Sequence, residues 1–207
     1  MKGARPSVST IEHVEVTMCR PHLREIPGHP LPEGYALRSF DPADSATWKR
    51  RWAEVETAAG EFSTPDRALE RFDREFGGRE EELAGRCLFL LRTGSEPAGP
   101  AGSGEEVIGT AMGWYDVAAP ENPAGRIHWV GIRPAWQGRG LSKPLVSAAL
   151  RVLAPRHDRA YLTTQTTSYV AVRLYLGLGF APCIVREEER RGWSILADLL
   201  GEPSLRR

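Results

Sequence analysis

The stretch Arg133-Pro134-Ala135-Trp136-Gln137-Gly138-Arg139-Gly140-Leu141-Ser142 decides the fold of this chain. A strand is predicted before it, over residues 126–132, and an amphipathic helix after it, over residues 141–153. The two glycines let the backbone approach a ligand closely, and the free N–H groups of the helix start favour an anion. Arg139 adds a cation and Ser142 a hydroxyl donor. The turn is therefore predicted to hold phosphates, although a Gly-x-Gly before a helix is also typical of a plain tight turn.

The remaining sequence predicts an α/β protein of mixed (α+β) character with helices flanking a central sheet. The apolar patterns and helix-start signals indicate further strands at residues 35–40, 87–91, 107–115, 160–164 and 181–185, and helices at 43–59, from 63 onward, at 171–178 and at 187–200. Residues 93–106 form the loop of a central hairpin, so the sheet is predicted to be mixed rather than doubly wound.

The first 33 residues are predicted to be an extension, partly extended or disordered, and residues 34–207 a single domain with a C-terminal helix. Within the extension, residues 1–10 are expected to be disordered, residues 11–18 to form a peripheral strand, and the Pro-rich residues 21–32 to be an extended connector. The extension is expected to add an edge strand or a homodimer contact, and the sequence does not choose between them.

Composition excludes several classes of function. Lys and Arg number 27 and so do Asp and Glu, so no net basic charge points to nucleic acid or to an anionic membrane. No apolar run suggests a signal peptide or a membrane span. The cysteines Cys19, Cys87 and Cys183 are scattered, which argues against a disulfide framework and against a metal site. A cytoplasmic location is expected.

Two motifs together resemble the GNAT superfamily of acyl-CoA-dependent N-acetyltransferases. Gln137-x-x-Gly140-x-Ser142 resembles the GNAT loop (Arg/Gln)-x-x-Gly-x-(Gly/Ala), with serine in place of the usual last residue. Residues 171–180, AVRLYLGLGF, resemble a second signature, Ala-x-x-Leu-Tyr-x-x-x-Gly-Phe. The family often carries asparagine three residues before that alanine, where this chain has Ser168. The order and separation of the two motifs are more specific than either motif alone.

The resemblance implies a GNAT-type sheet whose fourth and fifth strands, here residues 126–132 and 160–164, splay apart to admit acetyl-CoA. Backbone groups of the fourth strand would bind the pantetheine arm, and the loop amides would bind the pyrophosphate. The residues implied in cofactor binding are Val130, Gly131, Ile132, Gln137, Gly138, Arg139, Gly140, Leu141, Ser142, Lys143, Ser168 and Ala171.

The resemblance also implies direct acetyl transfer to an amine in a ternary complex. Tyr175 would be the general acid for the leaving thiolate, although periodicity alone favours a core tyrosine. His128 is the candidate general base, against the alternative of a structural histidine. By the two-residue period, Arg126, His128, Val130 and Ile132 share one face of their strand. Arg126 stands where some relatives carry a glutamate base, so a water-relayed base or an acidic acceptor group is expected.

The acceptor, a small-molecule or peptide amine, is not identified by any motif. Its site could include Trp48 and Trp52, which are otherwise core residues, and Tyr115 and Asp116 at a strand exit. The glutamate runs 80–82 and 187–189 are predicted to be solvated helix faces.

Three alternatives remain beside the acetyltransferase. The chain could be a non-catalytic acyl-CoA-binding sensor, or it could use another donor such as succinyl-CoA. An unrelated nucleotide-binding protein is disfavoured, because Gly-Lys-Ser/Thr and Gly-x-Gly-x-x-Gly are absent from the sequence.

Overall fold

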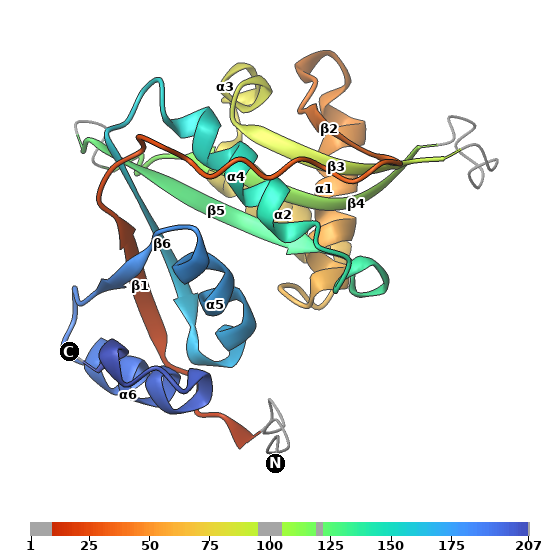
Figure 1. Ribbon diagram of the computed structural model, residues 1–207. Coiled ribbons are helices and arrows are strands. Elements are labelled where there is room, and N and C mark those ends of the chain that lie inside the picture. Colours follow the sequence, from red (N-terminus) through yellow and green to blue (C-terminus); the bar gives the residue numbers. More distant parts are fainter. Residues whose placement is uncertain (1–9, 95–104, 119–121, 207) are drawn as a thin grey trace.

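A seven-stranded mixed sheet runs through the computed structural model, which describes residues 10–94, 105–118 and 122–206 (Figure 1). The strand order is β2-β3-β4-β5-β6-β1-β7, and every neighbouring pair is antiparallel except β5 and β6. The predicted mixed α/β fold is confirmed. The strands are β1 (Glu15–Arg20), β2 (Tyr35–Ser39), β3 (Cys87–Thr93), β4 (Glu105–Trp114), β5 (Ala124–Ile132), β6 (Arg159–Gln165) and β7 (Ala181–Cys183).

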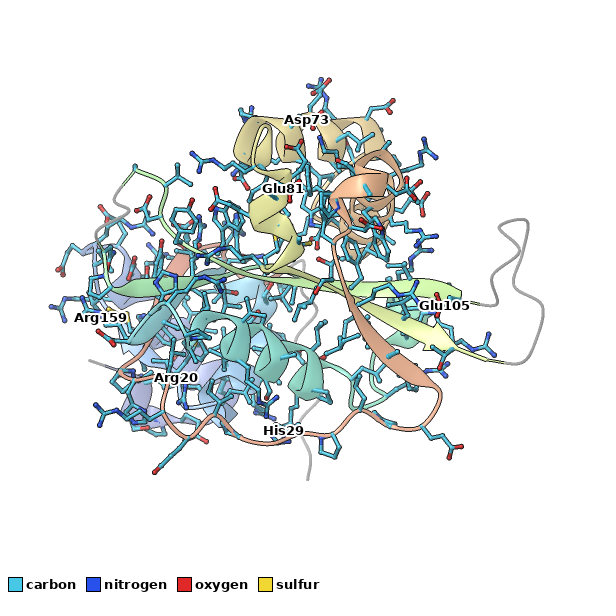
Figure 2. The ribbon with its side chains drawn as sticks, turned by 90° about the horizontal axis from the view of Figure 1, so that it is seen from above. Arg20, His29, Asp73, Glu81, Glu105 and Arg159 are labelled. Carbon is cyan, nitrogen blue, oxygen red and sulfur yellow. The ribbon has the colours of Figure 1, made fainter. Side chains whose placement is uncertain are left out.

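Helices cover both faces of the sheet. In Figure 2, Asp73 and Glu81 mark the helices on one face, and His29 lies on the segment along the opposite face, outside α4. The short helix α3 was not predicted as an element of its own, because five residues are too few to show a period. The helices are α1 (Ser45–Ala59), α2 (Pro65–Phe76), α3 (Glu80–Ala84), α4 (Ser142–Leu153), α5 (Tyr169–Gly177) and α6 (Glu189–Leu200).

Two cores hold these layers together. On the α1–α2 face the core is aromatic: Trp52 is fully buried, with its ring centroid 5.0 Å from that of Phe72, and Trp48 lies 4.6 Å from Phe89. The core on the α4–α6 face is mainly aliphatic and includes Leu145. Trp48 and Trp52 are therefore core residues, which was the simpler of their two interpretations.

Strand β1 lies inside the sheet, so the prediction of a peripheral or edge strand is wrong. It pairs with β6 on one side and with β7 on the other. Val16 and Met18 are fully buried in the α4–α6 core. Alternating residues look the same in an edge strand and in an interior one, and the partners of β1 lie about 140 to 166 residues away along the chain, so no local pattern indicates the pairing. The predicted disorder of residues 1–9 and most of the 93–106 loop lie outside the described residues.

The segment between β1 and β2 is an extended connector, as predicted. The amide of Leu23 donates to the carbonyl of Asp158 at 2.8 Å, and the Arg151 guanidinium donates to the carbonyl of Pro27 at 3.0 Å. These two bonds fix the connector along α4 and tie the first residues of the chain to the second half of the sheet.

Glu189 corrects the prediction that residues 187–189 are solvated. Its side chain is 1% exposed and accepts hydrogen bonds from the Thr17 hydroxyl at 3.0 Å and from the Val185 amide at 3.2 Å. The start of α6 is thereby anchored on β1. None of the helices in the described part of the chain combines the length and the apolar character that a bilayer crossing requires.

Candidate active site

Strands β5 and β6 diverge in the middle of the sheet. Their parallel pairing extends only over Ala124 to Arg126 on β5 and Arg159 to Tyr161 on β6. Beyond this point β6 stays paired with β1 as far as Gln165, and among the described residues no strand takes its place beside β5. The predicted splay is confirmed. The free edge of β5 offers backbone groups that an extended ligand could pair with.

A β-bulge at Trp129 interrupts the alternation of side chains between the two faces of the sheet along β5. Trp129 has a φ of 45°, and the register between β4 and β5 shifts between Thr110 and Met112. His128 and Trp129 consequently both reach α2, whereas Val130 packs in the core of the opposite face. The prediction that Arg126, His128, Val130 and Ile132 share one face is therefore wrong, because the two-residue period does not survive a bulge. A left-handed tryptophan costs about 1 to 3 kcal/mol.

The turn before α4 is open to solvent. Gly138 and Gly140 have φ values of 75° and 77°, which glycine adopts without strain. Residues 137–140 and Lys143 are exposed, and no described residue accepts a hydrogen bond from the amides between Gly138 and Lys143. The Gln137 side chain braces the turn by donating to the carbonyl of Ile132 at 2.9 Å. The turn thus presents free donors at a helix start, as an anion site requires.

Arg139 is held beside this turn rather than over it. Its guanidinium lies 4.6 Å from the ring of Trp136 and donates to the carbonyl of Ala135 at 3.3 Å. The arginine stays exposed and keeps donors free for an anionic ligand.

A cavity of about 280 Å³ opens where the strands separate. It gathers side chains from both sheet halves and from helices on both faces of the sheet, and it brings together six of the residues singled out in the sequence. Its lining includes Arg126, His128, Val130, Ser168, Ala171 and Tyr175, and also Glu15, Glu56, Glu61, Arg71, Trp129 and Thr163.

Tyr175 lies in the cavity wall on α5 and is 7% exposed. Burial raises the pKa of its phenol well above the usual value, and the charges of Glu56 and Glu61 raise it further. No described residue hydrogen-bonds to its hydroxyl, so the proton of this phenol is available to a ligand. Its ring packs edge-on against Phe180 at 5.9 Å.

His128 is fixed by Glu75 of α2, a residue that the sequence did not single out. Nε2 of His128 lies 3.1 Å from Oε2 of Glu75, and the indole N–H of Trp129 donates to the same oxygen at 2.7 Å. Burial lowers the pKa of His128, and the contact with Glu75 offsets this only in part. Burial alone would raise the pKa of Glu75, but the bonds from His128 and Trp129 and the charge of Arg71 bring it to about 2. A neutral His128 thus donates through Nε2 to a carboxylate, leaving Nδ1 as its acceptor.

Glu56 of α1 was also missed. Its side chain is 0% exposed, yet neither carboxyl oxygen has a hydrogen-bond partner among the described residues. Burial, with the charge of Glu61 added, raises the pKa of Glu56 to about 8. A signal was available, because Glu56 follows Trp48 and Trp52 at intervals of four on the apolar stripe of its helix.

The residues that the sequence suggested for the acceptor site lie in different places. Arg126 lines the cavity and donates to the Thr163 hydroxyl at 3.4 Å, without a carboxylate partner in the described part of the chain. Asp116 lines a neighbouring groove of about 750 Å³ along β6, β1 and β7, which also reaches Glu189 at the start of α6. Tyr115 lies in neither, since its hydroxyl donates to Glu82 at 2.7 Å beside α3.

Comparison with known proteins agrees with this geometry. Residues 51–180 match the family model described as "Acetyltransferase (GNAT) family". The chain is 34% identical over 164 residues to a mycothiol acetyltransferase of Nocardia farcinica, covering 78% of this chain and 50% of the relative. It is 28% identical over 184 residues to the mycothiol acetyltransferase of Mycobacterium ulcerans, covering 81% and 53%. The chain thus spans about half the length of these curated relatives.

A solved structure has the same fold. The GCN5-related N-acetyltransferase from Sphaerobacter thermophilus superposes with a TM-score of 0.60 at 22% identity, covering 82% of this chain and 48% of that one. At this identity the likeness concerns the fold alone.

Proposed function

Because this chain belongs to the GNAT acetyltransferase family, we propose that it transfers the acetyl group of acetyl-CoA directly to an amine. The observation that carries the proposal is the cavity at the splay, where the free edge of β5 and the phenol of Tyr175 meet. A tyrosine with an unshared proton beside an open strand edge fits a reaction in which a thiolate must leave.

The residues present fit acetyl-CoA. The free amides between Gly138 and Lys143 would hold the pyrophosphate, with Arg139 and Lys143 adding charge. Backbone groups of Val130, Gly131 and Ile132 would pair with the pantetheine arm, and Ser168 and Ala171 would border it across the cavity. When bound, acetyl-CoA supplies an activated thioester.

Tyr175 would hold the proton that the departing sulfur needs. Its raised pKa keeps the phenol protonated at neutral pH. A free thiol has a pKa of about 8.5, so a protonated phenol of still higher pKa acts by donating a hydrogen bond and completes the transfer as the thiolate forms. A backbone N–H near Val130 would support the negative charge that develops on the acetyl oxygen.

The acceptor is proposed to be a small molecule or a peptide with a primary amine. The names of the relatives make acceptors related to mycothiol the first to test. Arg126, with no carboxylate partner in the described residues, is proposed to bind an acidic or hydroxyl group of the acceptor. The groove lined by Asp116 continues the cavity past Thr163 and would take the remainder of the molecule.

Thiol release from acetyl-CoA, measured with a panel of amines, tests this function. Tyr175→Phe is expected to lower kcat by about 100-fold or more while the affinity for CoA stays within a factor of about two. Tyr169→Phe, a half-buried tyrosine of the same helix outside the cavity, is the matched control and should keep full activity. Tight CoA binding without turnover on any amine would instead support a non-catalytic acyl-CoA sensor. Faster turnover with succinyl-CoA than with acetyl-CoA would show that succinyl-CoA is the preferred donor.

A further inference from the structure

Glu56 is a buried carboxyl group that the fold leaves without a partner. It is fully buried, and both of its oxygens lack a hydrogen bond within the described residues. Such a group costs stability, because a polar group removed from water loses its hydrogen bonds, so its presence calls for a functional explanation. The cavity at the splay is the only one of the two described hollows that its side chain lines.

The carboxyl group of Glu56 packs against the backbone of β5 at Gly131. A Cβ atom at position 131 would come within 2.9 Å of Oε1 of Glu56, so Gly131 makes the room that the carboxylate occupies. Gly131 is the middle one of the three residues whose backbone is proposed to pair with the pantetheine arm. The carboxylate therefore sits against the strand segment along which a thioester would approach.

We propose that Glu56 is the general base of the transfer, taking the proton that the acceptor amine gives up; this role rests on the acetyltransferase function proposed above. Acid and base then occupy the same cavity on different helices, Tyr175 on α5 and Glu56 on α1. Each is free of hydrogen-bond partners among the described side chains, so each can engage the reacting groups.

His128 is less free for this task. Its Nε2 is engaged by Glu75, which also binds Trp129 and Arg71. This arrangement fixes the two aromatic side chains next to the bulge, which makes His128 a positioning residue for the strand. Glu56 has both oxygens available, whereas His128 has one ring nitrogen left.

Electrostatics suit proton transfer near neutral pH. The pKa of Glu56 of about 8 lets the group accept a proton and release it again in the physiological range. Glu61 is exposed and lines the same cavity, so it offers the proton a way to solvent. The other charged or titratable groups that act on Glu56 or share its cavity are Cys87 on β3, Tyr175 on α5, Arg71 on α2, Arg126 and His128 on β5, and Glu15 on β1.

The proton balance closes without any further reactant. The acceptor ammonium gives one proton to the Glu56 carboxylate, and the nitrogen lone pair forms the N–C bond as the C–S bond breaks. The sulfur takes the phenol proton of Tyr175, and the second nitrogen proton restores the phenol. Glu56 then returns its proton to water. The products are the N-acetylated amine and the free thiol.

The test compares the dependence of kcat/KM on pH in five proteins with one acceptor, so that the titration of the acceptor itself is common to all. In the wild type kcat/KM should rise as the pH approaches about 8, and this rising part of the profile is the pH limb that the variants are compared on. Glu56→Gln should lower kcat/KM by about 100-fold or more and leave CoA affinity, measured by calorimetry, unchanged. His128→Gln should keep the same pH limb. Glu61→Gln should move the limb to lower pH, because the charge of Glu61 raises the pKa of Glu56. Glu70→Gln, an exposed carboxylate of α2, should change nothing.

A second measurement needs no substrate. The infrared carbonyl band of a protonated carboxyl group should disappear between pH 6 and pH 9 in the wild type and be missing in Glu56→Gln. An active Glu56→Gln enzyme with an unaltered pH limb would overturn the proposal, as would a limb that His128→Gln abolishes. A wild type that releases no thiol with any amine refutes the acetyltransferase itself, and the general-base role with it.

Discussion

Replacing Glu56 with glutamine should make the protein more stable, and increasingly so as the pH rises. The two side chains have nearly the same shape, so the change mainly removes the ability to ionise. In the wild type the folded state holds the proton up to a pKa of about 8, whereas the unfolded chain loses it near the usual value of 4.5. Folding must therefore keep or take up a proton in this range, and stability is lost as the pH rises from 4.5 to 8.

The size of the effect follows from these two pKa values. Each pH unit between them is worth about 1.4 kcal/mol, so the upper bound above pH 8 is on the order of 5 kcal/mol. Water that enters the cavity around the charged form lowers this figure. We expect a gain on the order of 3 kcal/mol for Glu56→Gln at pH 8 relative to pH 5, which is a large part of the stability of a typical domain.

Urea denaturation at pH 5, 6.5 and 8 measures this gain directly, because the free energy of unfolding extrapolates linearly to water. Glu70→Gln is the control, since it removes one exposed carboxylate and should alter stability by less than about 0.5 kcal/mol at every pH. A Glu56→Gln variant whose advantage is the same at pH 5 and pH 8 would refute the reasoning. So would a variant less stable than the wild type at pH 8.

Three further changes probe the loop and the first strand. Gly140→Ala has open space for the new methyl group but keeps a φ of 77°, so it should cost about 1 kcal/mol and weaken CoA binding several-fold; unchanged affinity in calorimetry would contradict a role for this turn. Met18→Ala should destabilise by about 2 to 5 kcal/mol in urea, because Met18 is fully buried, and a loss under about 1 kcal/mol would mean that β1 is not a core strand. Gly192→Ala should cost about 1 to 3 kcal/mol, since the added Cβ would lie 2.5 Å from a methyl carbon of Val16, and a neutral effect would argue against the packing of α6 on β1.

The sequence was sufficient where local signals carry the structure. The turn around Gly138 and Gly140 and the motif around Tyr175 carried the resemblance to the GNAT family, and that resemblance, rather than the periodicity of the residues, implied the splay and a role for the phenol. The pairing of β1 with β6 and β7 has no such local cause. It depends on segments about 140 to 166 residues away, and the same alternating residues would serve an edge strand equally well.

The bulge at Trp129 and the burial of Glu56 were missed for a related reason. A two-residue period assumes a regular strand, and nothing in the residues around Trp129 marks the extra residue that turns it toward α2. A glutamate on an apolar helical stripe can lie at the rim of a core or inside it. Only the packing of α1 on Gly131 decides which, and that packing is tertiary.

Three locally unfavourable features meet at the same cavity: the left-handed Trp129, the unpartnered Glu56 carboxyl and the unpaired edge of β5. Regular pairing, an apolar side chain and a closed sheet would each be more stable, so packing alone does not explain why they coincide. The acetyl-CoA binding proposed above would explain it, because a pantetheine arm would pair with the open edge and the Glu56 carboxylate would accept the proton of the acceptor amine. A bound CoA ligand should therefore raise the free energy of unfolding measured in urea, because it binds the folded chain and not the unfolded one.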